Sequence, residues 1–176
     1  SKRVFDIIAR GVPSYEIYSI DEAFLDFSGI KDPYNFAFYL KKKVKRWTGI
    51  PISIGISYTK TLSKVASHIA KKSEEGVCYL NDKNKINHIL RSLPLDDIWG
   101  VGMRSAIKLK KYRIHTAKDL IECDEIWVRR VMNVGGLRMV RELKCIPHFS
   151  LDNGRNMKKS IRTSRSFSVE ITDYSR

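Results

Sequence analysis

Residues 18–26 read YSIDEAFLD and place two acidic side chains, Asp21 and Glu22, next to each other inside an apolar run with strand-like composition. Neighbouring carboxylates repel, and burying them is costly unless a cation offsets the charge. Mg²⁺ does this with one or two carboxylates and leaves positions for phosphate oxygens. Successive strand residues point to opposite faces, so both acids reach one site only at a bend. Two interpretations stay open here: a metal site for phosphoryl transfer, or a surface turn with two solvated acids.

The charge of the chain suits a phosphate-rich partner. Its 176 residues include 33 Lys and Arg against 19 Asp and Glu, a formal net charge of +14. Such an excess is typical of proteins that bind nucleic acid or an anionic membrane surface. No apolar run approaches the roughly 20 residues that span a bilayer, which argues against an integral membrane protein. The cysteines Cys78, Cys123 and Cys145 are far apart and odd in number, which favours a reduced cytoplasmic setting without a zinc site.

The first 80 residues alternate between two hydrophobic periods. The pattern predicts a split α/β layer in the order strand, helix, strand, helix, strand, preceded by a short helix. The predicted helices cover residues 2–10, 34–47 and 59–72, and the predicted strands cover 16–27 (one bent strand or a hairpin), 52–56 and 76–80.

The remaining residues change character. Residues 81–145 are predicted to form a small all-α domain with breaks at Pro94, 100–102 and 135–136. The polar, basic stretch that follows has the composition of an extended linker, and residues 166–171 alternate like a strand. A lone strand cannot bury its apolar face, and no cap precedes the first helix, so we expect a fragment of a larger protein.

A second motif joins a predicted strand to a helix at residues 55–64, GISYTKTLSK. A helix N-terminus attracts anions through its free N–H groups and dipole. Lys64 and Lys71 lie two helical turns apart on one face, so Lys71 could reach a phosphate. The alternative is a solvated basic face, the commoner role for any single lysine. The Walker pattern of nucleotide-binding loops is absent.

A third motif, WGVGMRSAIKL at residues 99–109, runs from a Gly-x-Gly turn straight into a predicted helix. Glycines let backbone N–H groups approach a ligand without obstruction by Cβ. The pattern resembles a helix-hairpin-helix, which grips nucleic-acid backbones without reading their sequence. The alternative is a plain turn between helices.

Together these motifs resemble the Y-family, lesion-bypass DNA polymerases. Residues 19–26 are similar to the central catalytic motif of that family and residues 54–67 to the next one. Residues 93–102 and 164–174 resemble the bacterial UmuC branch specifically. The match is collinear over nearly the whole chain.

The resemblance implies an α+β architecture in three parts: a partial palm with a mixed or antiparallel sheet (1–80), a helical thumb with the helix-hairpin-helix (81–150), and a basic linker leading into the little-finger domain (151–176). Asp21 and Glu22 would be catalytic carboxylates that hold Mg²⁺, and Lys71 would contact the incoming deoxynucleoside triphosphate. The backbone of primer-template DNA would contact Gly100, Val101, Gly102, Arg104 and Lys108. Further expected partners are a UmuD-like dimer and a sliding clamp, in the bacterial cytoplasm.

The departures from the family pattern are equally informative. The family's first catalytic carboxylate, its steric-gate aromatic and its fingers have no counterpart in this sequence, so the chain by itself is predicted to be inactive but to bind DNA. Arg113 stands where the hairpin motif usually has glycine. Two alternatives remain: a non-catalytic helix-hairpin-helix module that binds DNA, and a nucleotide-cyclase-like palm domain.

Overall fold

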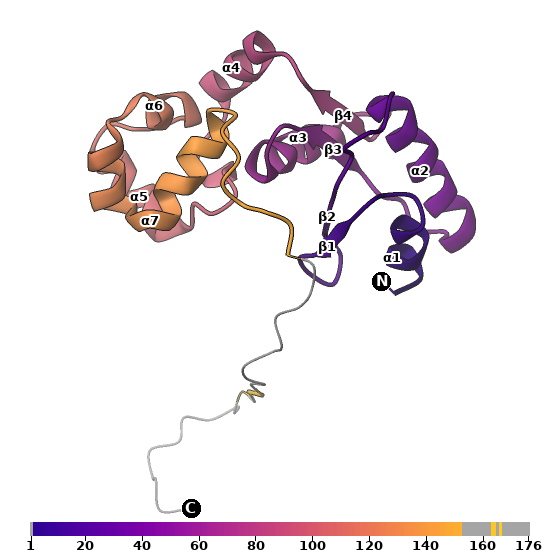
Figure 1. Ribbon diagram of the computed structural model, residues 1–176. Helices are drawn as coiled ribbons and strands as arrows, with labels where there is room; N and C mark the ends of the chain where they lie inside the picture. Colours follow the sequence, from indigo (N-terminus) through magenta and orange to yellow (C-terminus); the bar gives the residue numbers. More distant parts are fainter. Residues whose placement is uncertain (1, 153–162, 165, 167–176) are drawn as a thin grey trace, which may run out of the picture.

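The computed structural model describes residues 2–152 together with residues 163, 164 and 166 (Figure 1). All of the predicted strand over 166–171 except residue 166, and most of the predicted linker, lie outside the described residues. No helix in this part of the chain combines the length and the apolar character needed to cross a membrane.

The first half of the chain is built from short strands and three helices. A helix, α1, is followed by a hairpin of β1 and β2, and then by α2, β3, α3 and β4 in alternation. Their bounds are α1 Lys2–Ala9, β1 Tyr15–Ile17, β2 Ala23–Leu25, α2 Pro33–Thr48, β3 Ile54–Ser57, α3 Lys60–Lys72 and β4 Val77–Leu80. Of the two arrangements predicted for residues 16–27, the structure has the hairpin.

Local signals explain where the two long helices begin and end. Asp32 caps α2 by accepting a hydrogen bond from the Asn35 backbone N–H at 3.1 Å, and Gly49 ends the helix in the left-handed conformation with φ 74°. The hydroxyl of Thr59 caps α3 through the Leu62 N–H at 3.2 Å. Both helices therefore start within a residue or two of the predicted positions.

The strands form two separate two-stranded sheets, where the sequence predicted a single layer. β1 and β2 pair antiparallel with Tyr15 opposite Leu25, and β3 and β4 pair parallel with Ile54 opposite Val77. Among the described residues, the second edges of β2 and β3 have no strand partner. A cavity of about 900 Å³ is lined by residues of both strands. Sequence periodicity identifies strands but does not say which edges meet, so it could not reveal this division.

The second half of the chain is helical, as predicted. It contains four α-helices and one short 3₁₀ segment. Their bounds are α4 Lys83–Ser92, η1 Leu95–Asp97, α5 Met103–Lys111, α6 Ala117–Glu122 and α7 Glu125–Leu143.

Helix α7 consists of two arms that meet at Asn133, whose φ of 64° and ψ of −171° are not helical. The Asn133 side chain caps the second arm by accepting a hydrogen bond from the Gly135 N–H at 2.8 Å. The two arms fold back on each other and bring Glu125 of the first arm into an ion pair with Arg141 of the second, at 2.5 Å. The predicted break at residues 135–136 therefore falls two residues too late.

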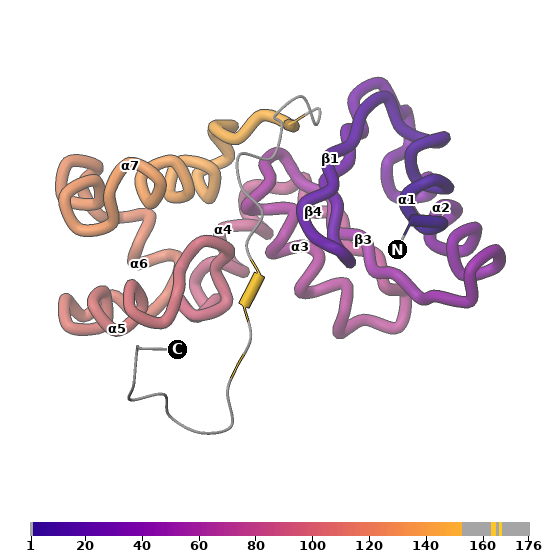
Figure 2. Tube along the Cα trace, turned by 90° about the horizontal axis from the view of Figure 1, so that it is seen from below, coloured from indigo at the N-terminus to yellow at the C-terminus, as the bar shows by residue number. Residues whose placement is uncertain are grey.

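Two clusters of buried apolar side chains hold the molecule together. One joins α1, α2, β3 and β4, and the other joins α3 to all the helices of the second half. Helix α3 accordingly lies between the helical half and the sheets, as both views show (Figures 1 and 2). Residues on α3 can therefore face the hairpin while the same helix supports α4–α7.

Candidate functional site

The two acids of the central motif lie in the turn that joins β1 to β2. The turn is closed by the carbonyl of Glu22, which accepts hydrogen bonds from the backbone N–H groups of Tyr18 at 2.9 Å and Ser19 at 3.1 Å. The Ser19 hydroxyl donates to Oδ1 of Asp21 at 2.6 Å. This hydrogen bond, together with the ammonium groups of Lys71 and Lys64, lowers the pKa of Asp21 below its ordinary value.

Asp21 and Glu22 are less buried than the apolar residues around them in the sequence would suggest. Asp21 is exposed, Glu22 is half-buried, and the neighbouring Ile20 is 79% exposed. The acids thus lie in a surface turn, an arrangement that the sequence left open, because the hairpin turn projects them outward from its strands. Their charges are balanced by lysines at the surface.

Helix α3 supplies those lysines along the face that it turns toward the hairpin. Lys64 forms an ion pair with Glu22 at 2.6 Å. One turn earlier, Lys60 pairs with Glu16 of β1. Two turns after Lys64, Lys71 acts on Asp21 through its charge. Lys60, Lys64 and Lys71 of one helix thus lie along the hairpin, from strand β1 to the turn that carries the acids.

The acids and the lysines line the same cavity, the one of about 900 Å³ between β2 and β3. Two adjacent carboxylates suit Mg²⁺, which is usually bound through one or two carboxylates, waters and phosphate oxygens. No group of three or more His, Cys, Asp or Glu side chains that could hold a metal ion occurs within the described residues. Asp21 and Glu22 alone therefore supply two carboxylates, and a Mg²⁺ ion held by them would need further oxygen ligands.

The Gly-x-Gly turn lies directly before α5. Gly100 adopts a left-handed conformation with φ 91°, and Gly102 caps α5 with open space around its Cα. The Val101 side chain is buried, and its N–H donates to the Ile98 carbonyl at 3.0 Å. The N–H groups of Gly100 and Gly102 have no acceptor in the part of the chain that the structure describes, so they are available to solvent or to a ligand.

The basic residues around this turn differ in what they contact. Arg104 is exposed, whereas the Lys108 ammonium donates to the Val131 carbonyl at 2.9 Å, at the end of the first arm of α7. Arg113 adopts φ 60°, the conformation that glycine favours at this position, at a cost of about 1 kcal/mol. The local turn is thus retained in spite of the substitution.

Sequence reasoning missed an aromatic cluster that joins the acidic hairpin to the glycine turn. The rings of Tyr18, Phe24 and Phe149 each pack edge-on with Trp99, with centroids 5.5–5.7 Å apart. The indole N–H of Trp99 also donates to the Tyr18 hydroxyl at 3.2 Å. The position of Trp99, directly before Gly100, was the available signal.

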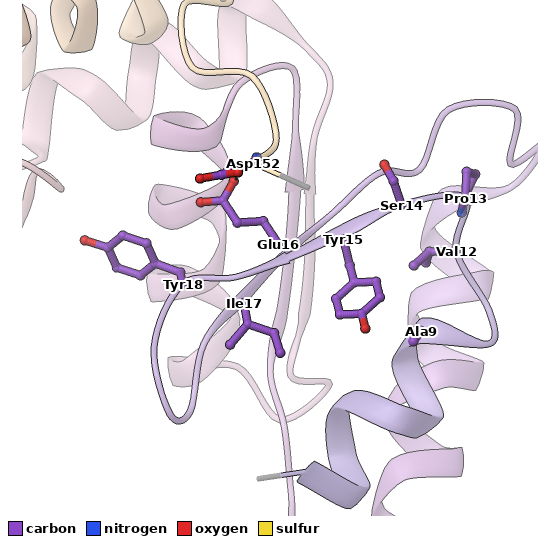
Figure 3. A pocket seen from close by; sticks show the side chains of 9 residues that line it. All are labelled: Ala9, Val12, Pro13, Ser14, Tyr15, Glu16, Ile17, Tyr18 and Asp152. Atoms are coloured by element: carbon purple, nitrogen blue, oxygen red, sulfur yellow. Dashed lines mark hydrogen bonds between the residues drawn. The ribbon is translucent and has the colours of Figure 1, made fainter. Parts of the chain in front are cut away.

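A second cavity, of about 530 Å³, opens beside strand β1 (Figure 3). Glu16 and Asp152 lie side by side there, and the Glu16 carboxylate accepts a hydrogen bond from the Asp152 backbone N–H at 2.7 Å. Tyr15 and Ile17 point to the opposite side of the strand. Glu16 therefore ties both Lys60 and the segment that follows α7 to the hairpin.

Sequence reasoning also missed Glu142, near the end of α7. Its side chain is fully buried, and its carboxylate accepts hydrogen bonds from Thr61, His148 and Phe149. Nothing in the local sequence distinguishes it from Glu125, the other acid of α7, which is only half-buried.

Comparison with known proteins gives consistent matches. Residues 1–68 match the model of the impB/mucB/samB family. The chain is 39% identical to Protein UmuC of Salmonella typhimurium over 180 residues, covering 99% of this chain and 43% of that protein. It is 32% identical to DNA polymerase IV of Staphylococcus epidermidis over 177 residues, covering 98% and 49%. The chain thus spans less than half the length of these relatives.

Solved structures share the fold. A Dbh ternary complex superposes with a TM-score of 0.72 at 19% identity, covering 86% of this chain and 46% of that one. DinB from Sulfolobus solfataricus superposes with a TM-score of 0.64 at 21% identity, covering 81% and 42%. At this identity the likeness speaks for the architecture alone.

Proposed function

Because the chain belongs to the UmuC branch of the Y-family DNA polymerases, we propose that it forms part of a polymerase that copies damaged templates. In this proposal residues 1–80 are palm, residues 81–150 are thumb, and the basic residues beyond lead into the next domain. The observation that carries the proposal is the meeting of Asp21, Glu22 and Lys71 at one cavity.

Asp21 and Glu22 would hold Mg²⁺ together with phosphate oxygens of a deoxynucleoside triphosphate. When bound, the metal supplies Lewis-acid stabilisation of the oxygens that attack and leave in the transfer. Asp21 suits this role because it lines the cavity, and the Ser19 hydrogen bond and the nearby lysines that lower its pKa favour the ionised carboxylate. Glu22 is already paired with Lys64, so a bound cation would compete with that ammonium for the carboxylate.

The lysines of α3 would position the triphosphate. Phosphoryl transfer depends mainly on positioning and on neutralising charge, and a lysine acts on a phosphate as a point charge. Lys71 lies within electrostatic reach of Asp21 and is free to meet a phosphate at the metal. Lys64, once released from Glu22, would provide a second cation.

A two-metal site needs one more carboxylate than the two described here. The cavity lined by β2 and β3 offers a place for it, because neither strand has a partner on its second edge among the described residues. A strand seated there would pair with both edges and bring its side chains beside Asp21. Without such a strand, residues 1–176 are expected to bind DNA and to be inactive.

The thumb would hold primer-template DNA through the glycine turn. The N–H groups of Gly100 and Gly102 would bind a backbone phosphate, with Arg104 beside them, in the manner of a helix-hairpin-helix. The Trp99 cluster keeps this turn next to the acidic hairpin. Lys108 would first have to leave the Val131 carbonyl. A UmuD-like dimer and a sliding clamp remain partners that the family relationship suggests.

Primer extension tests the proposal. The chain replaces the aligned stretch of the Salmonella UmuC relative, and the chimera is assayed with the accessory proteins of that relative. Extension past a template lesion is expected, with a loss of at least a hundredfold in Asp21→Asn. The matched control is Asp26→Asn, on the same hairpin, where Asn can still accept from the Ser28 N–H. Equal activity of Asp21→Asn and the unsubstituted chimera would remove the metal assignment.

A second candidate is a DNA-binding module without chemistry, which the net charge of +14 and the glycine turn favour. Under this alternative DNA binding persists, while no chimera extends a primer. A cyclase-like palm is disfavoured by the attached helical half with its glycine turn.

A further inference from the structure

We infer that Glu142 is a positioning residue: it fastens the helical half of the chain to the N-terminus of α3, and so sets where DNA held by the glycine turn meets the Asp21–Lys71 site. The inference rests on the proposed function. Its structural part, the fastening, can be tested separately.

The two oxygens of the Glu142 carboxylate serve two different segments. Oε2 accepts hydrogen bonds from the Thr61 backbone N–H and the Thr61 hydroxyl, both at 2.8 Å. Oε1 accepts from the backbone N–H groups of His148 at 3.1 Å and Phe149 at 2.9 Å. One carboxylate thus joins the start of α3, the end of α7 and the chain beyond it.

The backbone of the same residue adds a fifth link. The Thr59 hydroxyl, which already accepts from the Leu62 N–H, donates to the Glu142 carbonyl at 3.0 Å. Thr59 by itself caps the N-terminus of α3. Glu142, which lies 81 positions beyond Thr61 in the sequence, is therefore not needed as a local cap. It is a connection between two parts of the fold.

The charge of Glu142 is held without a cation. The side chain is 0% exposed, and no Lys, Arg or His forms an ion pair with it among the described residues. Four hydrogen bonds and the positive end of the α3 dipole offset the cost of burial. An apolar side chain at this position would avoid that cost. What the carboxylate adds is a set of directional hydrogen bonds, and these fix the position of α3 relative to the end of α7.

The position of this connection relates it to the proposed chemistry. Helix α3 carries Lys64 and Lys71 toward the acids, three and ten residues beyond Thr61. On the other side, Phe149 packs on Trp99, directly before the glycine turn. Glu142 therefore stands between the triphosphate-facing helix and the DNA-facing turn, and misplacement by about 1 Å is enough to slow a positioned reaction about a hundredfold.

Glu142→Gln is the informative substitution. The amide keeps the size of the side chain and one acceptor oxygen, but its NH₂ group faces two N–H or O–H donors. In the chimera, kcat for nucleotide addition is expected to fall at least tenfold, while the Kd for primer-template DNA stays within twofold. Glu125→Gln, which removes another carboxylate of α7, is the control and should leave kcat unchanged.

Hydrogen exchange on residues 1–176 supplies the structural readout. In Glu142→Gln the amides of Thr61, His148 and Phe149 should exchange at least tenfold faster, while amides inside α5 and the first arm of α7 keep their protection. Thr61→Val, which removes only the hydroxyl donor, should produce a smaller effect that is not additive with Glu142→Gln.

Each outcome decides the matter. An unchanged kcat, or a parallel loss of kcat, DNA affinity and protection throughout the chain, would overturn the positioning role, since the second pattern is that of plain destabilisation. If the unsubstituted chimera extends no primer, the proposed function fails. Unchanged exchange at Thr61, His148 and Phe149 refutes the fastening whether or not the chimera is active.

Discussion

A Cβ atom on Gly55 would stand 2.0 Å from the backbone nitrogen of Ser67, so β3 and α3 meet backbone to backbone. No side chain separates them at this point, and only glycine permits the approach. The contact sets how deeply α3 lies against the sheet. It therefore also sets where Lys64 and Lys71 stand relative to the hairpin turn.

Gly55→Ala is expected to destabilise the fold by about 3 kcal/mol, because the methyl group meets backbone atoms that cannot rotate away. Urea unfolding followed by circular dichroism measures the change. The control is Gly102→Ala, where a Cβ has no neighbour within 4 Å and stability should change little. Equal midpoints for the two variants would contradict this account.

Residues 1–176 should bind duplex DNA with a steep dependence on salt. The formal charge of +14 acts through release of counterions from the phosphates, so the logarithm of the binding constant falls linearly with the logarithm of salt concentration. Fluorescence anisotropy at several salt concentrations gives the slope. A slope near zero would rule out backbone binding as the source of affinity.

Gly102→Val should weaken that binding about tenfold without unfolding the protein. The glycine has φ −80°, which valine adopts readily, and open space around it, so the added side chain crowds only a bound phosphate. Anisotropy titrations compare the variant with the unsubstituted chain, and thermal melting checks its stability. Unchanged affinity would remove the glycine turn from the DNA interface.

Ser19→Ala should raise the pKa of Asp21 toward its ordinary value of about 3.9, because the Ser19 hydroxyl is the largest cause of the lowered pKa. A carboxyl whose pKa is lowered by folding favours the folded state above its ordinary pKa, and that contribution is lost as the pH falls through the folded value. Carbon-detected NMR titration of Asp21 reads the pKa directly. A lower pKa in the variant than in the unsubstituted chain would refute the assignment.

Gly136→Ala should destabilise the helical half by about 2 kcal/mol. A Cβ there would stand 2.3 Å from the Met132 Cβ, across the bend at Asn133, so the two arms of α7 would be pushed apart. Thermal unfolding measures the loss. Gly135→Ala, whose Cβ would meet only the Asn133 side chain at 3.2 Å, is the milder comparison.

Local patterns predicted the local elements well. The acid pair in a hairpin, the strand before α3 and the glycine turn before α5 are all encoded within about a dozen residues, and the structure has each of them. The bend in α7 was misplaced because the Asn133 cap was a weaker signal than two adjacent glycines. Whether Asp21 is buried or exposed stayed open in the sequence, because apolar neighbours do not determine which way a turn projects.

Contacts between residues far apart in the chain could not be predicted from the sequence. The pairing of Lys64 with Glu22 joins residues 42 positions apart, and that of Glu142 with Thr61 joins residues 81 apart. A single sequence contains no signal for such contacts, because each residue has many chemically equivalent alternatives. That β2 and β3 each have an edge with no strand partner within the described residues likewise emerges only when the strands are placed in space.

The hydrogen bond between Glu16 and the backbone of Asp152 determines where the chain leaves the described core. The segment after α7 crosses back to the hairpin, so its end at Asp152 lies beside β1 rather than at the far end of the helical half (Figures 1 and 3). A probe attached at Asp152 would therefore be held close to Glu16. Replacing Glu16 with a residue that cannot accept this hydrogen bond would remove that attachment.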